Sequence, residues 1–148
     1  MLLDAAEEQQ TSGKTPVLRD RKYTSLVPRF VIQEHHARTH HFDFRLEKDG
    51  VFKSWAVPKG LPETPGIKRL AVQVDDHELS FGDFEGEIEE GQYGAGEVRI
   101  WDRGIYELIE WTDQRISFSL GGNQIKGQFV LVRFGRGKPN EWLLIKKS

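Results

Sequence analysis

The chain contains no cysteine among its 148 residues. This absence excludes disulfide bonds, thiolate ligands and a cysteine nucleophile, so a metal site could use only nitrogen and oxygen ligands. Residues 1–10 carry no basic side chain, and no apolar run approaches the length of a membrane span. We therefore expect no secretory signal, no membrane partner and a cytoplasmic location.

A dominant charge is also lacking, because the net charge is only −2. The charges are nevertheless uneven along the chain. Residues 14–69 hold twelve basic and six acidic side chains, residues 75–97 hold nine acidic and no basic ones, and residues 126–148 hold six basic and one acidic. Two interpretations stay open: the charges mix on solvated faces of the fold, or the basic regions form a surface for a polyanion.

Helical patterns are few, and short β-strand patterns separated by turn residues dominate from Phe30 onward. The length fits a single domain at residues 16–148, preceded by a polar, poorly ordered lead-in at residues 1–15. No strand shows an obvious edge protection, which favours a mainly β fold, an antiparallel closed β-barrel of about eight strands with few short helices. The four tryptophans lie in strand patterns and are expected in the core. The expected strands are 41–47, 51–57, 68–75, 97–101, 105–111, 115–120, 124–134 and 141–147, with a hairpin turn at 102–104.

Four of the five histidines fall within seven residues. Polar and apolar residues alternate over 41–47, so His41 and Asp43 would share one face of a strand while the intervening apolar residues face the core. The spacing of His35, His41 and Asp43 predicts a site for a divalent ion, because two imidazoles and one carboxylate suit borderline metals. The alternative is a polar barrel rim with ordinary exposed histidines. The other two members, His36 and His40, are expected to be structural or surface residues.

Further polar residues could complete a phosphate site. Arg45 follows Asp43 on the same face and could bind an oxyanion through its planar fork, although an arginine on a strand often forms a surface ion pair. His77 could donate to a phosphate oxygen or protonate a leaving group, or it could be a turn histidine. Lys59 and Arg69 are candidate contacts to phosphate or to a DNA backbone, or they are plain surface charges.

Several collinear blocks resemble the 3′-phosphoesterase domain of bacterial DNA ligase D. The similarity extends over nearly the whole chain, from Pro28 to Lys147, without an attached ligase or polymerase sequence, as in a free-standing member. The blocks are Gln-Glu-His at 33–35, His-Phe-Asp-Phe-Arg-Leu-Glu at 41–47, Lys-Ser-Trp-Ala-Val-Pro-Lys-Gly at 53–60, Arg-Leu-Ala-Val-Gln-Val at 69–74 with Asp76 and His77, Asp-Phe-Glu-Gly at 83–86, Tyr-Gly-Ala-Gly at 93–96, Trp-Asp-Arg-Gly at 101–104 and Trp-Leu-Leu-Ile-Lys-Lys at 142–147.

The resemblance implies a β-barrel enzyme that heals DNA 3′ ends with Mn²⁺ as its cofactor. Such an enzyme removes a 3′-terminal ribonucleoside from a primer strand and then the remaining 3′-phosphate, leaving a 3′-OH. It implies primer–template or duplex 3′ ends as substrates, and a separate DNA ligase, polymerase and Ku as partners. By position, His35, His41 and Asp43 match the metal ligands, Arg45 and His77 match the groups that hold the phosphate, and Lys59, Arg69 and Asp75 match weaker substrate-binding positions.

Two positions depart from the family pattern. Phe81 stands where many members carry tyrosine, so a phenolic hydroxyl near the phosphate is missing. Glu34 stands where lysine is common. Two other functions stay open on the residues alone. A metal-dependent oxygenase could use His41, Asp43 and the distant His77 as a facial triad, and a DNA-end adaptor would bind ends without releasing a product.

Overall fold

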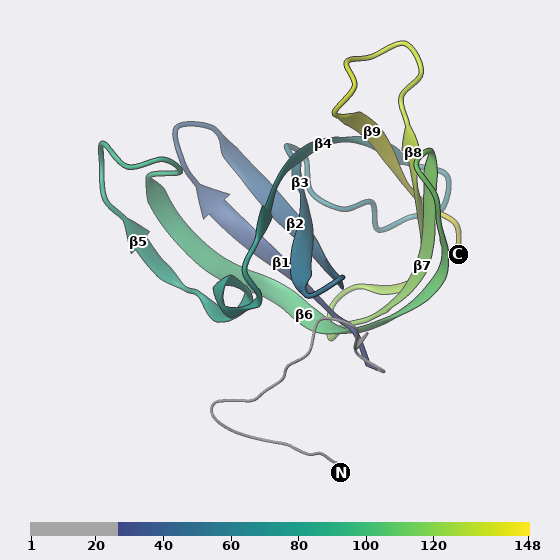
Figure 1. Ribbon diagram of the computed structural model, residues 1–148, viewed down its shortest axis with the longest axis horizontal. Helices are drawn as coiled ribbons and strands as arrows, with labels where there is room; N and C mark the ends of the chain where they lie inside the picture. The colour runs from purple at the N-terminus through teal and green to yellow at the C-terminus, as the bar shows by residue number, and fades with distance from the viewer. Residues whose placement is uncertain (1–26) are drawn as a thin grey trace.

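The computed structural model describes residues 27–148, so the expected lead-in at residues 1–15 lies outside the described part. Eight strands form a closed antiparallel β-barrel in the order β1-β2-β3-β4-β9-β8-β7-β6, and β6 pairs with β1 to close it (Figure 1). The expected fold class is confirmed. The strands are β1 (Arg29–His36), β2 (His40–Lys48), β3 (Val51–Val57), β4 (Lys68–His77), β5 (Gly86–Ile88), β6 (Gly96–Trp111), β7 (Arg115–Gly121), β8 (Lys126–Arg133) and β9 (Glu141–Lys146).

The expected hairpin turn at 102–104 is wrong, because β6 runs through these residues as one strand. Its first half pairs with β1 and its second half with β7. The carboxylate of Asp102 accepts hydrogen bonds from the backbone N–H groups of residues 103 and 123–125, so it caps the β7–β8 turn. Gly104 permits close strand contact, since a Cβ there would lie 2.3 Å from the carbonyl oxygen of Gly121.

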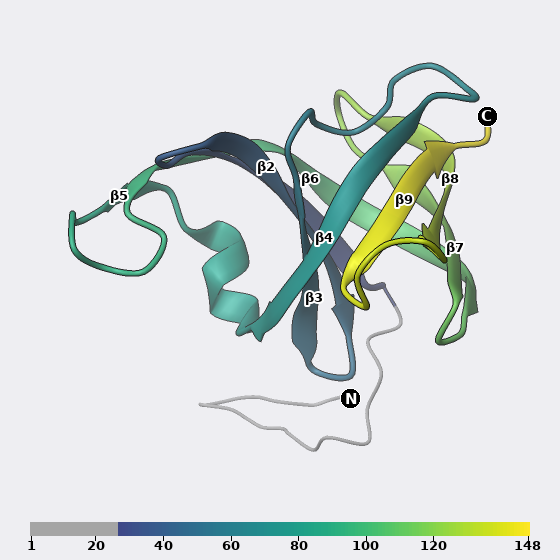
Figure 2. The same ribbon diagram turned by 90° about the horizontal axis from the view of Figure 1, so that it is seen from above.

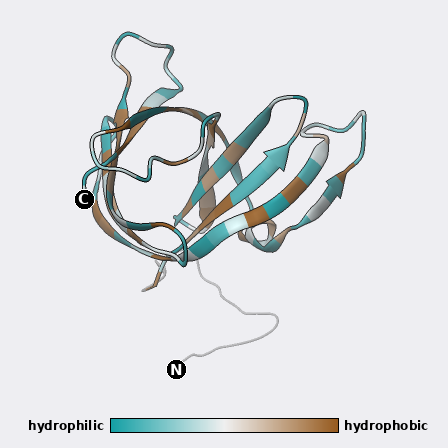
Figure 3. Ribbon diagram, turned by 180° about the vertical axis from the view of Figure 1, so that it is seen from behind, coloured by the Kyte–Doolittle hydropathy of each residue, from teal (hydrophilic) through white to brown (hydrophobic). Residues whose placement is uncertain are grey.

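Aromatic and aliphatic side chains fill the barrel interior. The ring of Phe44 on β2 lies 6.3 Å from Trp55 on β3 and 5.7 Å from Phe118 on β7, centroid to centroid. These three side chains are fully buried, and Trp142 is nearly so. The two remaining tryptophans are partly buried against the same core, as expected from their strand patterns. Figure 3 shows hydrophobic and hydrophilic residues alternating along several strands, as a barrel with one apolar face requires.

The outer face of β1, β2 and β3 is also covered, although their side chains there are largely polar. A 3₁₀ helix, η1 (Leu79–Asp83), follows β4 outside the barrel (Figure 2). Gly82 of η1 packs so closely that a Cβ would lie 2.4 Å from the ring of Phe52. Within residues 27–148, no helix is long and apolar enough to cross a membrane. Because η1 covers part of this outer face, the polar side chains there are partly enclosed and form the candidate site.

Candidate metal centre

The predicted metal ligands come together on the outer face of the β1–β2 hairpin. His35 of β1 lies directly opposite His41 of β2, and Asp43 follows two residues later on the same face. One ligand atom from each of the three lies within 4.8 Å of the others. His35 and Asp43 are buried and His41 is half-buried. This group is compatible with a bound metal ion, while the identity of the ion stays a prediction.

Hydrogen bonds donated to backbone carbonyl groups orient both imidazoles toward the carboxylate. The Nε2 of His35 lies 2.7 Å from the carbonyl oxygen of Gly94, and the Nδ1 of His41 lies 3.0 Å from that of Thr39. A carbonyl only accepts, so each of these nitrogens carries a proton. The opposite nitrogens lie 3.3 Å and 3.1 Å from the two oxygens of Asp43. A cation can be held between these nitrogens and the carboxylate, either a proton on an imidazole or a metal ion, and a metal-binding imidazole is typically oriented by such a second hydrogen bond.

The electrostatics of the group keep its carboxylate ionised. The hydrogen bond to Asp43 raises the pKa of His41 above its usual value and outweighs the opposite effect of burial. Burial would raise the pKa of Asp43, yet the hydrogen bond from His41 and the charge of Arg45 together hold it below its usual value. Asp43 is therefore ready to bind a cation at neutral pH.

Arg45 lies beneath the metal group and holds several of its neighbours. Its side chain is only 3% exposed. Its Nε donates to Gln33 at 2.7 Å, and its Nη1 donates to the hydroxyl of Ser54 at 2.8 Å and to His77 at 3.1 Å. The Nη2 lies 3.7 Å from Asp43 and has no closer acceptor among residues 27–148. Burial lowers the pKa of Arg45, but an arginine stays charged.

His77 reaches the same face through an irregularity in strand pairing. Phe52 pairs with His77 while Ser54 pairs with Val74, so β4 holds one extra residue at this point. The Nδ1 of His77 accepts from Arg45, because a guanidinium can only donate. The same Nδ1 lies 3.0 Å from the carbonyl oxygen of Asp75. Because this nitrogen carries no proton in the neutral ring, it donates no hydrogen bond to that oxygen. Burial, followed by the charge of Arg45, lowers the pKa of His77, so the ring is neutral with its proton on Nε2.

A cavity of about 350 Å³ opens above these residues. Its wall combines the metal group and His77 with the ring of Phe81 and with apolar side chains of β3, β4, β5 and β6. Tyr93 also lines it and is 92% exposed, which leaves its ring free for a ligand. Of the weaker candidates, only Phe81 lines the cavity. Lys59, Arg69 and Asp75 lie elsewhere: Lys59 in the exposed loop after β3, Arg69 on the opposite face of β4, and Asp75 with an exposed side chain.

Sequence reasoning missed several residues that hold this site. Gln33 is fully buried; its oxygen accepts from Arg45, while its nitrogen donates to the carbonyl oxygens of Phe81 and Phe84. Ser54, also fully buried, accepts from Arg45. Gln33 and His35 share one strand face, so alternation alone could have singled out Gln33. No sequence signal could have found the carbonyl of Gly94, because its contact with His35 joins segments 59 residues apart.

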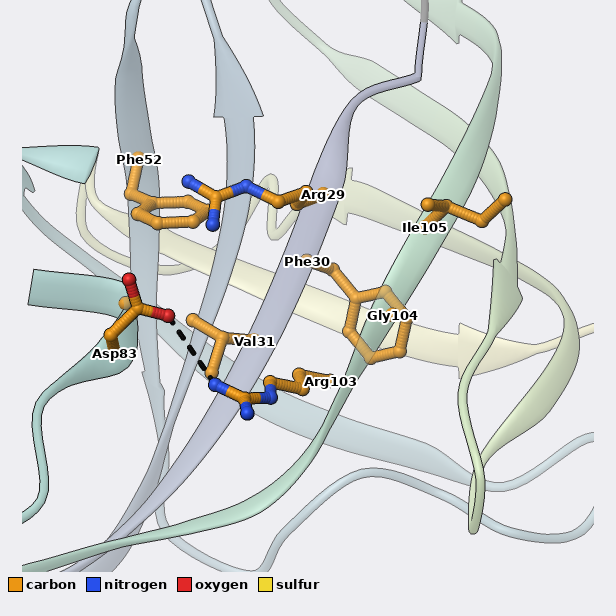
Figure 4. A pocket seen from close by; sticks show the side chains of 9 residues that line it. Arg29, Phe30, Val31, Phe52, Asp83, Arg103, Gly104 and Ile105 are labelled. Carbon is orange, nitrogen blue, oxygen red and sulfur yellow. Dashed lines mark hydrogen bonds and ion pairs between the residues drawn. The ribbon is translucent and has the colours of Figure 1, made fainter. Parts of the chain in front are cut away.

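A second cavity of about 350 Å³ is lined in part by Gly82 and Asp83 of η1 and shares none of these polar side chains (Figure 4). Val31 and Phe52 form its apolar wall, and Arg103 pairs with Asp83 at 3.3 Å across its edge. Arg29 lies over the ring of Phe52 at 5.5 Å. Its basic groups are therefore already partnered, which separates this cavity from the metal group.

A closed β-barrel with a metal-compatible His₂Asp group and a buried arginine on its outer face defines the class of this protein. The chain belongs to the DNA ligase D 3′-phosphoesterase domain family, whose model matches residues 33–133. The match includes all three predicted ligands, Arg45 and His77. The family resemblance expected from the sequence is confirmed.

Curated relatives support this assignment. A multifunctional non-homologous end joining protein LigD from Pseudomonas aeruginosa is 44% identical over 97% of the chain. A protein with the same description from Mycobacterium bovis is 49% identical over 70% of the chain, and one from Mycolicibacterium smegmatis is 41% identical over 95%. The aligned region makes up only 17%, 14% and 20% of these proteins, respectively, so the chain spans a fifth or less of their length.

Proposed function

We propose that this protein is a metal-dependent phosphoesterase that heals DNA 3′ ends during non-homologous end joining. It removes a 3′-terminal ribonucleoside from a primer strand as a phosphodiesterase, and then removes the 3′-phosphate as a phosphomonoesterase, leaving a 3′-OH. The observation that carries the proposal is the convergence of one nitrogen each of His35 and His41 on the carboxylate of Asp43, next to a buried arginine. Membership of the phosphoesterase family supports the same reaction class.

His35, His41 and Asp43 would hold the ion through nitrogen and oxygen donors, and Mn²⁺ is proposed as that ion because the family resemblance implies it. When bound, such an ion polarises a phosphate oxygen and lowers the pKa of a bound water. The neutral His77 would donate its Nε2–H to a nonbridging phosphate oxygen, since its other nitrogen already accepts from Arg45. The Nη2 of Arg45 supplies a fixed positive charge on the same side of the site.

The cavity wall suits the end of a nucleic-acid strand. Its volume of about 350 Å³ is close to the lower limit of small-molecule sites and has room for a terminal sugar phosphate. The exposed ring of Tyr93 at this cavity offers a surface on which a base can stack. Its apolar members, including Val74 and Val98, would limit the access of water to the reacting phosphate. DNA 3′ ends are therefore the proposed substrates, with a ligase, a polymerase and Ku as proposed partners.

A labelled primer–template that ends in a single 3′-ribonucleotide tests this function. With Mn²⁺ the protein should convert the primer first to a 3′-phosphate and then to a 3′-OH end, and a chelator should stop both steps. Asp43→Asn and His41→Ala should each lose turnover while keeping their circular dichroism spectrum, because neither side chain packs in the barrel core. Asp49→Asn, in the β2–β3 turn, is the matched control and should keep wild-type rates.

The same assay separates the two other functions considered. An adaptor would bind the primer–template and release nothing, and an oxygenase would release succinate from 2-oxoglutarate. The structure groups His35, not His77, with His41 and Asp43, which does not favour the oxygenase triad. Full activity of Asp43→Asn would contradict the proposed metal site, whatever the substrate.

A further inference from the structure

A second group of potential metal ligands lies on the opposite face of the β1–β2 hairpin. Because strand residues alternate, Glu34 and His36 point away from His35, toward the face that carries the core residues Phe30 and Ile32. His40 of β2 lies directly opposite His36 in the last residue pair of the hairpin. One ligand atom each from Glu34, His36 and His40 lies within 4.8 Å of the others.

The geometry of this group is close to that of a coordination shell. The Nε2 of His40 lies 2.8 Å, and that of His36 3.4 Å, from the same carboxylate oxygen of Glu34. In a tetrahedral site with bonds of about 2.0–2.1 Å, neighbouring ligand atoms lie roughly 3.3 Å apart. The two imidazole rings are parallel, with centroids 4.4 Å apart, so both edges face the carboxylate together.

The surroundings leave these groups available to a cation. Among residues 27–148, no lysine or arginine forms an ion pair with Glu34, so the two histidines are its only ion-pair partners. Neither Nδ1 has a hydrogen-bond partner within the same range, and both rings are about half exposed. Water can therefore solvate the Nδ1 of each ring, while both Nε2 atoms are directed at the carboxylate.

We propose that Glu34, His36 and His40 form a second metal site, separate from the candidate centre on the other face of the hairpin. Two imidazoles and one carboxylate select a borderline divalent ion, and Zn²⁺ with a water as fourth ligand is the ion that this donor set fits best. The ion joins β1 to β2 across their last residue pair, so it stabilises the end of the hairpin that also carries His35 and His41. This site does not depend on the phosphoesterase function.

Isothermal titration with Zn²⁺ in the Asp43→Asn variant tests the second site, because that substitution removes a ligand of the first one. The variant should bind about one equivalent of Zn²⁺, and its thermal unfolding midpoint should rise with the ion. Adding His40→Ala or His36→Ala should abolish both effects. Adding His77→Ala is the matched control: it removes a histidine that belongs to neither group, and should leave the binding unchanged.

A second measurement covers the case in which Asp43→Asn fails to fold. In the otherwise unchanged protein, metal analysis after equilibration with Zn²⁺ should find about two equivalents, falling to about one in His40→Ala. Equal Zn²⁺ binding with and without His40 would overturn the proposal. Catalytic rates enter neither measurement, so failure of the phosphoesterase proposal is detected separately.

Discussion

Arg45 is the residue on which most of the polar contacts of the site converge. It holds Gln33, Ser54 and His77 by hydrogen bonds from two of its three nitrogens, and it lies 4.9 Å from the ring of Phe81. This arrangement needs the planar fork of a guanidinium, which can bond in several fixed directions at once. The remaining nitrogen, Nη2, lies 3.7 Å from Asp43 and is the one that the proposed function assigns to the substrate phosphate.

Arg45→Lys tests this role because it keeps the charge and loses the fork. We expect kcat/KM to fall on the order of 10²-fold, about 2.7 kcal/mol of transition-state stabilisation. The measurement is the initial rate of 3′-ribonucleoside release with Mn²⁺. Lys53→Arg, a matched exchange at a position that pairs only with Asp76, is the control. A lysine variant as fast as the wild type would reduce Arg45 to a simple counter-charge.

His77 and Phe81 are adjacent in the cavity wall, with ring centroids 5.0 Å apart. A phosphate monoester carries more negative charge than a diester and should depend more on nearby donors. His77→Ala should therefore impair 3′-phosphate removal at least as much as ribonucleoside removal, and Phe81→Tyr should raise one or both rates through the added hydroxyl. Time courses on two primers, one for each end, measure both effects. Wild-type rates in His77→Ala on both primers would show that His77 is not catalytic.

At the scale of the element, β6 runs straight through the turn expected at 102–104, and its Asp102 side chain binds the turn between two other strands. Asp102 is 4% exposed, and its two oxygens accept four backbone N–H groups. Burial would raise the pKa of Asp102, but these hydrogen bonds outweigh it and hold the pKa below its usual value. The ionised side chain therefore joins β6 to the turn between β7 and β8.

Asp102→Ala should lower the free energy of unfolding by about 2–3 kcal/mol at pH 7, because buried N–H groups lose their acceptor. The folded-state pKa is depressed, so the charge-dependent stabilisation is fully present above the unfolded value of about 3.9 and is lost as pH falls through the folded value. The difference between variant and wild type should thus shrink in acid. Urea unfolding at pH 7 and at pH values below about 4 measures it. Asp113→Ala, at an exposed turn position, should show neither effect.

At the scale of the whole molecule, the barrel is closed around a single aromatic core. Phe44 contacts rings from β3 and β7, which lie on different sides of the barrel. Phe44→Ala should therefore cost about 3–5 kcal/mol of unfolding free energy. Urea unfolding gives this value, and Ile109→Ala, at a position 55% exposed, should change stability by less than about 0.5 kcal/mol. A loss of similar size in both variants would contradict the idea of one closed core.

The sequence by itself determined the fold class and the identity of the three candidate ligands. Alternation over 41–47 places Phe44 in the core and Asp43 on the other face, as the structure shows, because a strand has a side-chain period of two. The pattern of turn residues also predicted most strand ends, because turn chemistry, like strand periodicity, depends on residues close together in the chain. The alternation also predicts a shared face for His41, Asp43 and Arg45, which the structure retains.

Only the tertiary structure decided how that face becomes a site. Local signals cannot report an irregular pairing, so the one extra residue of β4 that turns His77 toward Arg45 was not predictable. The same holds for the continuity of β6 through Asp102, which depends on partners in a turn more than 20 residues away. The burial of Arg45 likewise requires η1 and the segment around Gly94 to cover the barrel from outside. These features arise from long-range backbone pairing, whereas periodicity and turn chemistry are written locally in the chain.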